Sequence, residues 1–195
     1  MKVSKSFVFA LLAVVGMIFT PAAFAHTFGA HGAGFAGGLA HPFFGLDHLL
    51  AMVAVGLWSA QLGGSALWRV PVAFVTAMTV GAIVANPALD VTWLETAIAG
   101  SVLALGLMVA FRLRLPSLLA VAAVSCFALF HGYAHGLEMP QTASPLGYGL
   151  GFVLATASLH LVGLYLGLSM APRGHVMSRI SGVAIAAVGM LLITA

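Results

Sequence analysis

The sequence is nearly without charge. Of its 195 residues, 6% are charged and 62% are hydrophobic, whereas average soluble chains carry about 25% charged residues. This excludes a soluble globular domain. The seven Lys and Arg, against four Asp and Glu, are too sparse for a nucleic-acid surface. The single cysteine, Cys126, excludes an intrachain disulfide. The sequence also lacks a glycine-rich phosphate loop with a lysine, so we expect no ATP-driven step in this polypeptide.

The first 25 residues have the pattern of a secretory signal peptide. Lys2 and Lys5 precede an apolar run over residues 7–19, and a small-x-small cleavage site ends at Ala25. The apolar run is short for a membrane span, which takes about 20 residues. We therefore expect residues 1–25 to be cleaved. The alternative is an uncleaved seventh helix.

Residues 26–195 are predicted to form one transmembrane domain of the all-α class, a polytopic membrane helix bundle. Six apolar segments in it are each long enough to predict a transmembrane helix. They cover residues 43–60, 68–85, 91–111, 115–133, 146–170 and 180–194. Pairs of small residues four positions apart favour close packing of these helices in lipid. Such pairs are Gly147 with Gly151, Gly163 with Gly167, and Gly182 with Ala186.

Signal cleavage requires the mature N-terminus to lie outside the membrane. With six helices, every arginine of the mature chain then falls on the inner side, as the positive-inside rule requires. These arginines are Arg69, Arg112, Arg114, Arg173 and Arg179. Four aromatic residues fall near the predicted interfaces with the lipid headgroups, where an aromatic belt is expected. They are Trp58, Trp68, Trp93 and Tyr148.

Two histidines and a carboxylate mark the start of the first predicted helix. They are His41, Asp47 and His48. If Pro42 occupies the first helical position, His41 caps the helix and His48 returns to nearly the same face seven residues later. Ionisable groups are costly to insert into a membrane, so they are usually paired, liganded or lining a watery cavity. This stretch therefore predicts a functional site.

A second cluster ends the fourth predicted helix. His131, His135 and Glu138 are spaced i, i+4 and i+7, so they fall within roughly 60° of one another on a continuous helix. Both clusters lie toward the outer membrane face in this topology, and we expect them to share one metal site. Glu95 either adds a carboxylate to that site or is an interfacial charge. His160, deep in the fifth helix, either forms a second site or makes a buried hydrogen bond.

The new N-terminus offers a further candidate ligand group. The terminal amine and the imidazole of His26 can chelate a metal ion, with His31 nearby. The alternative is a solvated N-terminal tail. Imidazole and carboxylate ligands suit Ni²⁺, Co²⁺, Zn²⁺ or Cu²⁺ better than Cu⁺, Mg²⁺ or Ca²⁺. Ligand type does not choose among those four ions.

These ligand clusters are compatible with a transporter of metal ions. Two alternatives use the same residue types. An intramembrane zinc-dependent hydrolase could hold zinc with histidines and a carboxylate and leave one position open for water. A haem-binding electron carrier could use paired transmembrane histidines.

Both clusters belong to longer motifs. The motifs are His41-Pro42-x-x-Gly45-x-Asp47-His48-x-Leu50-Ala51-Met52 and Phe130-His131-Gly132-x-Ala134-His135-Gly136-x-Glu138. Together with the signal peptide and the six spans, they resemble the HupE/UreJ family of nickel and cobalt permeases over essentially the whole chain. The resemblance implies secondary uptake of Ni²⁺ or Co²⁺ across a bacterial inner membrane, often for hydrogenase or urease maturation. We therefore expect a transporter that is not an enzyme and holds no prosthetic group. By this resemblance, the six histidines and carboxylates of the two motifs are the candidates for metal binding.

Overall fold

A computed structural model describes residues 34–89, 91–139, 144–171 and 175–195. The predicted signal peptide, its cleavage site and the candidate ligands His26 and His31 lie outside these described residues. All regular secondary structure in the described part of the chain is helical, which confirms the all-α fold class. The helices are α2 (Phe35–Phe44), α3 (Leu46–Leu62), α4 (Ala66–Ile83), α5 (Leu94–Phe111), α6 (Ser117–Glu138), α7 (Pro145–Met170) and α8 (Val176–Thr194).

The chain is a multi-pass membrane protein. Helices α4 to α8 are each long and apolar enough to cross a membrane, and α2 with α3 passes the same test as one broken span. Apolar side chains at these helix surfaces are widely exposed, as lipid contact requires. Five helices therefore qualify singly, and the broken pair, counted as one span, gives the sixth.

The start of the first span differs from the prediction. Pro42 lies inside α2 and not at the first position of the long helix, and α2 and α3 meet at 84° around Gly45. Gly45 has an extended backbone, with φ −90° and ψ 113°. A Cβ there would lie 2.6 Å from Nδ1 of His48 and 2.9 Å from Oδ1 of Asp47, so these side chains fold back over a position that only glycine leaves open. His41 and His48 therefore stand on two helices and do not share one helical face.

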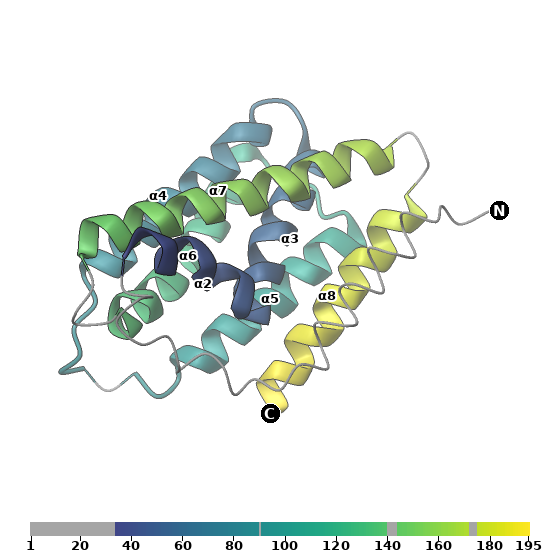
Figure 1. Cartoon of the computed structure of the whole chain (residues 1–195). Helices are drawn as coiled ribbons and strands as arrows, with labels where there is room; N and C mark the ends of the chain where they lie inside the picture. Colours follow the sequence, from purple (N-terminus) through teal and green to yellow (C-terminus); the bar gives the residue numbers. More distant parts are fainter. Residues whose placement is uncertain (1–33, 90, 140–143, 172–174) are drawn as a thin grey trace.

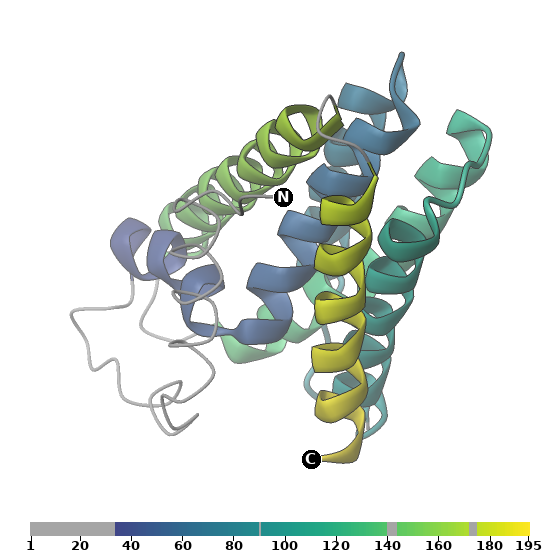
Figure 2. The same ribbon diagram turned by 90° about the vertical axis from the view of Figure 1, so that its right-hand side faces the viewer.

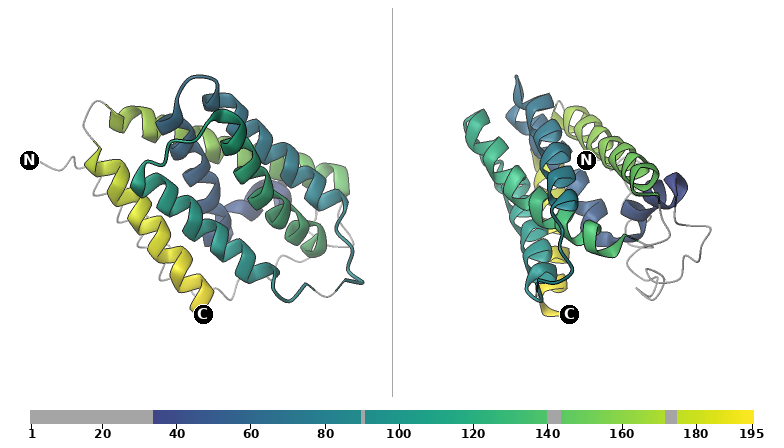
Figure 3. Two further views of the ribbon diagram at one scale, coloured as in Figure 1. Left: turned by 180° about the vertical axis from the view of Figure 1, so that it is seen from behind. Right: turned by 90° about the vertical axis from the view of Figure 1, so that its left-hand side faces the viewer.

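The helices pack in pairs along seams of small residues. Helix α4 lies along α6, α5 along α8, and α3 and α2 both lie along α7; Figure 1 shows α2 and α7 in front, and Figure 3 shows the other two pairs from behind. The predicted small-residue positions lie at these seams. Gly163 meets the backbone of α3, Gly182 meets that of α5, and Gly151 meets that of α2. Close backbone approach at small residues favours the association of helices in lipid.

The three most extensive pairings among the six long helices follow the pattern of an inverted repeat, whereas the contacts of α3 with α4 and α5 have no comparable counterpart in the second half. In such a repeat, α3, α4 and α5 correspond to α6, α7 and α8. The contact between α4 and α6 then has its counterpart in the contact between α7 and α3, and the contact between α5 and α8 is its own counterpart. Membrane transporters are often built from two such halves around a central site. Helix α2 has no counterpart in the second half among the described helices.

Two glycines of α5 give a matched test of this packing. A Cβ at Gly106 would lie 2.7 Å from Cα of Ala186 and 2.9 Å from the carbonyl oxygen of Gly182, whereas a Cβ at Gly100 would meet nothing within 4 Å. We expect Gly106→Ala to lower the free energy of unfolding by about 1–3 kcal/mol, because α8 must move away. Gly100→Ala should leave it unchanged or raise it slightly, since alanine favours helix. Thermal unfolding in detergent measures both; equal midpoints would show that the α5–α8 seam is loose.

The arginine-bearing ends of the helices gather at one end of the bundle. Figure 2 shows the connections from α3 to α4 and from α5 to α6 at this end, opposite the C-terminus. Trp58 donates its indole N–H to the carbonyl oxygen of Leu113 at 2.8 Å and is fully buried. The prediction that Trp58 belongs to the aromatic belt is therefore wrong. Its buried side chain instead ties α3 to the residues that follow α5. Trp68 and Trp93 are more than half exposed, as the belt requires.

Candidate metal site

Three helices bring four histidines together. His41 comes from α2, His48 from α3, and His131 and His135 from α6. The ring centroid of His135 lies 4.8 Å from that of His41 and 4.2 Å from that of His48, and the centroids of His48 and His131 are 5.3 Å apart. The two sequence clusters, more than 80 residues apart, thus lie side by side. We call these four residues the histidine cluster.

A carboxylate completes one part of the cluster. Oε2 of Glu138 lies 3.5 Å from Nε2 of His41 and 3.5 Å from Nδ1 of His135. One ligand atom from each of these three residues lies within 4.8 Å of the others. Metal–ligand bonds of about 2.0–2.2 Å place neighbouring ligand atoms roughly 3–4 Å apart. A small inward movement of the side chains would therefore let these three residues coordinate one ion.

Asp47 holds the ring of His48. Its Oδ1 accepts a hydrogen bond from the His48 ring nitrogen Nδ1 at 2.6 Å and another from the His48 backbone N–H at 2.8 Å. The proton of the neutral imidazole then sits on Nδ1, which leaves a lone pair on Nε2. That Nε2 is buried and makes no hydrogen bond with the described residues. A carboxylate bound to the far side of an imidazole is the usual support of a metal-binding histidine.

His131 is fixed in a comparable way by a residue that the sequence did not reveal. Ser101 of α5 donates its hydroxyl to the carbonyl oxygen of Ile98 at 2.7 Å, so its Oγ accepts from Nε2 of His131 at 2.8 Å. Nδ1 of His131 keeps its lone pair and has no partner in the described part of the chain. His131 is completely buried. A single serine in an apolar helix carries no sequence signal that separates it from a packing residue.

Helix α7 closes the other side of the cluster. The hydroxyl of Tyr148 lies 2.7 Å from Nδ1 of His41, and the ring of Phe152, one helical turn later, lies 4.2 Å from that of His135. Tyr148 is only 5% exposed, so it supports the cluster and does not belong to the aromatic belt. In the sequence, only the i, i+4 spacing of Tyr148 and Phe152 could have indicated this role, and that spacing is common in any helix.

The cluster borders a partly open cavity of about 650 Å³. Asp47, His48 and Glu138 line it, and so does Glu95 from the first turn of α5. Glu95 is exposed and stands on the cavity wall. The three carboxylates make this cavity negative, and a negative cavity attracts cations.

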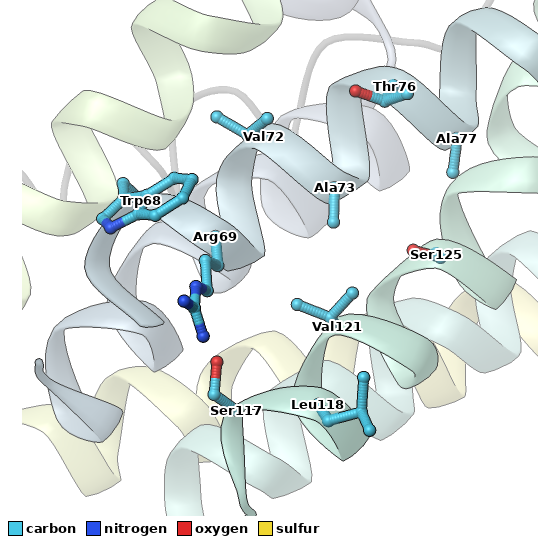
Figure 4. Close-up of a pocket in the computed structure, with 10 residues that line it drawn as sticks. All are labelled: Trp68, Arg69, Val72, Ala73, Thr76, Ala77, Ser117, Leu118, Val121 and Ser125. Atoms are coloured by element: carbon cyan, nitrogen blue, oxygen red, sulfur yellow. The ribbon is translucent and has the colours of Figure 1, made fainter. Parts of the chain in front are cut away.

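A second cavity, of about 490 Å³, lies between α4 and α6 (Figure 4). Its lining residues are Trp68, Arg69, Val72, Ala73, Thr76, Ala77, Ser117, Leu118, Val121 and Ser125. They include no histidine and no carboxylate. Figure 4 shows the guanidinium of Arg69 pointing toward Ser117, so the one charge in this cavity is positive. This lining does not suit a metal cation, in contrast to the cavity beside the histidine cluster.

His160 lies apart from the histidine cluster. It is 2% exposed, in the middle of α7, and its nearest aromatic neighbour is Phe74, at 5.2 Å between ring centroids. Neither of its ring nitrogens makes a hydrogen bond with the described residues. One expected alternative was that a buried hydrogen bond holds His160. No described residue is a partner for such a hydrogen bond.

Comparison with known proteins identifies relatives over nearly the whole sequence. The family model described as HupE / UreJ protein matches residues 12–192. A curated protein, Protein HupE from Rhizobium leguminosarum bv. viciae, is 45% identical over 166 residues, which are 85% of this chain and 87% of that protein. No solved structure matches.

Proposed function

This chain belongs to the HupE/UreJ family, and we propose that it is a permease for a divalent transition-metal ion, foremost Ni²⁺ or Co²⁺, in the bacterial inner membrane. The observation that carries the proposal is the meeting of His41, His135 and Glu138, whose ligand atoms lie within 4.8 Å of one another. Two imidazoles and a carboxylate, supplied by the two helices α2 and α6, are a ligand set for borderline metal ions. Zn²⁺ and Cu²⁺ fit the same ligands. In this proposal no prosthetic group takes part.

Burial increases along the cluster, which suggests how an ion enters. The side chain of Glu138 is 48% exposed and that of His41 is 29% exposed, whereas that of His135 is 4% exposed. His131 is fully buried. A hydrated ion would first meet the carboxylate and His41, and the deeper imidazoles would replace its remaining water. This stepwise exchange avoids a single costly loss of the hydration shell.

The roles of the predicted ligands differ in this mechanism. His41, His135 and Glu138 capture the ion. His48 and His131 offer one free ring nitrogen each, next to His135, and would take the ion further in. Asp47 acts on His48, because its Oδ1 holds the protonated Nδ1. Glu95 is placed to attract cations into the cavity.

The membrane potential is sufficient to drive entry. With the inside negative, entry of a cation gains about 2.3 kcal/mol per charge for each 100 mV. We propose that residues 1–25 are removed, that residues 26–195 form the transporting domain, and that its N-terminus faces the periplasm. The arginines near the opposite end of the bundle would then lie at the cytoplasmic face, as the positive-inside rule requires. The delivered ion would supply hydrogenase or urease maturation.

Uptake by liposomes tests the proposal. The purified chain is reconstituted, an inside-negative potential is imposed, and entry of labelled Ni²⁺ and Co²⁺ is followed. We expect saturable uptake that rises with the potential and exceeds that of protein-free liposomes. Uptake at the protein-free rate for both ions, with and without the imposed potential, would contradict the proposed function.

A further inference from the structure

His160 is a buried imidazole that the histidine cluster does not use. It lies in α7, 2% exposed, and both of its ring nitrogens lack hydrogen-bond partners among the described residues. Buried polar groups in proteins are nearly always hydrogen-bonded. An ionisable residue inside a membrane span is rarer still and is a functional-site hypothesis by default. The position therefore needs a partner that the described residues do not supply.

One phenyl ring connects His160 with the histidine cluster. Phe74 of α4 is fully buried. Its ring centroid lies 5.9 Å from that of His131 and 5.2 Å from that of His160, which it meets edge to face. The three rings come from three helices, α6, α4 and α7. An ion that leaves the deepest histidine of the cluster would thus reach His160 after passing the edge of one aromatic ring.

Further donor atoms lie next to this ring. Thr156, one turn before His160 on α7, donates its hydroxyl to the thioether sulfur of Met78 at 3.9 Å. Met78 stands one turn after Phe74 on α4. The pair Phe74 and Met78 on α4 therefore faces the pair His160 and Thr156 on α7. Both donors are buried, with Thr156 at 0% and Met78 at 2% exposure, so nitrogen, sulfur and oxygen donors face one another in an apolar surrounding.

His160 lies further along α7 than the residues of α7 that contact the histidine cluster. Tyr148, whose hydroxyl forms a hydrogen bond with Nδ1 of His41, precedes His160 by twelve residues in the same helix. At about 1.5 Å per residue, this places His160 roughly 18 Å further along α7.

We propose that His160 is a second, inner binding position for the same divalent transition-metal ion, with Met78 and Thr156 beside it. The inference rests on the proposed transport function and adds a step to it. The ion passes from His131 along the edge of Phe74 to the free ring nitrogen of His160. It then continues toward the end of α7. Because capture at the cluster precedes this step, His160 should control the rate of passage and not the affinity of capture.

Substitution of His160 tests the step in reconstituted liposomes with Ni²⁺ as the probe. Glutamine retains a polar side chain but is a poor ligand for these ions. For His160→Gln we expect a maximal uptake rate at least tenfold lower and a half-saturating Ni²⁺ concentration that is unchanged. A native rate in this variant, while the native chain transports, would overturn the inference and leave the proposed function intact. No uptake by the native chain would overturn both.

A second variant reports on the bound ion directly. A thiolate binds these ions, so His160→Cys should recover part of the uptake rate. With Co²⁺ added to the purified full chain, it should also show a thiolate-to-cobalt charge-transfer absorption. The native chain, whose single cysteine is Cys126, is the control and should lack this absorption. Identical Co²⁺ spectra for the native chain and His160→Cys would overturn the inference, even if His160→Gln fails to fold.

Discussion

Replacing His135 by alanine is expected to lower Ni²⁺ uptake at low Ni²⁺ concentration by about 100-fold or more. Supporting partners of metal ligands are worth about 10–100-fold in metal affinity, and a direct ligand should reach at least the upper end. His135 is the central residue of the histidine cluster, since its ring lies within 4.8 Å of both His41 and His48. Its removal also leaves Glu138 with only one imidazole. Initial uptake rates in liposomes measure the effect.

The chain offers a matched control for this variant. His175 is an exposed histidine at the start of α8. His175→Ala removes the same side chain and should transport at the native rate. If His135→Ala also transports at the native rate, the cluster is not the capture site. If both variants fail alike, the loss reflects a general effect of removing a histidine and contradicts the assigned role.

Asp47→Asn is expected to raise the half-saturating Ni²⁺ concentration by about 10–100-fold. The asparagine carbonyl oxygen can still accept both hydrogen bonds that Oδ1 of Asp47 accepts from His48. It carries no negative charge, so it polarises the imidazole less, and Nε2 of His48 becomes a weaker ligand for a cation. The geometry of the pair is preserved, so the change acts through the lost charge.

A double-variant cycle separates this role from direct binding. If Asp47 acts through His48, the variant Asp47→Asn with His48→Ala should be no weaker in metal affinity than His48→Ala alone. Additive losses would mean that Asp47 binds the ion itself. Co²⁺ binding to the purified variants gives the four affinities that the cycle needs.

The sequence predicted those parts of the structure that depend on local periodicity. The i, i+4, i+7 spacing of His131, His135 and Glu138 places them on one helix, and α6 runs to Glu138 without a break. Apolar length predicted the long helices, because a membrane fixes the length of a span. The pairs of small residues fall at helix contacts, since only small residues allow the backbones to meet.

The parts that sequence reasoning missed depend on tertiary contacts. Proline favours the first turn of a helix, so the run around Pro42 predicted one helix that starts there. In the structure Pro42 is buried within α2, which packs on α7 through Gly151. The supports Ser101 and Tyr148 come from helices distant in the sequence. Nothing in their own neighbourhoods indicates which histidine they would meet.

The break at Gly45 has a consequence for the site. One straight helix would present His41 and His48 from the same side. The 84° bend lets His41 approach from α2 while His48 approaches from α3, and α6 supplies the remaining two histidines. Imidazoles that converge from three helices can surround an ion, and ligands on rigid helices hold their geometry better than ligands on loops.

X-ray absorption spectroscopy of the purified chain loaded with one equivalent of Ni²⁺ tests the central claim most directly. The account predicts a first shell of nitrogen and oxygen donors with at least two imidazoles. It also predicts that the imidazole signal decreases in a His41→Ala, His135→Ala double variant. A shell without imidazole, or one that is identical in the native chain and the double variant, would contradict the convergence of these helices on a metal ion.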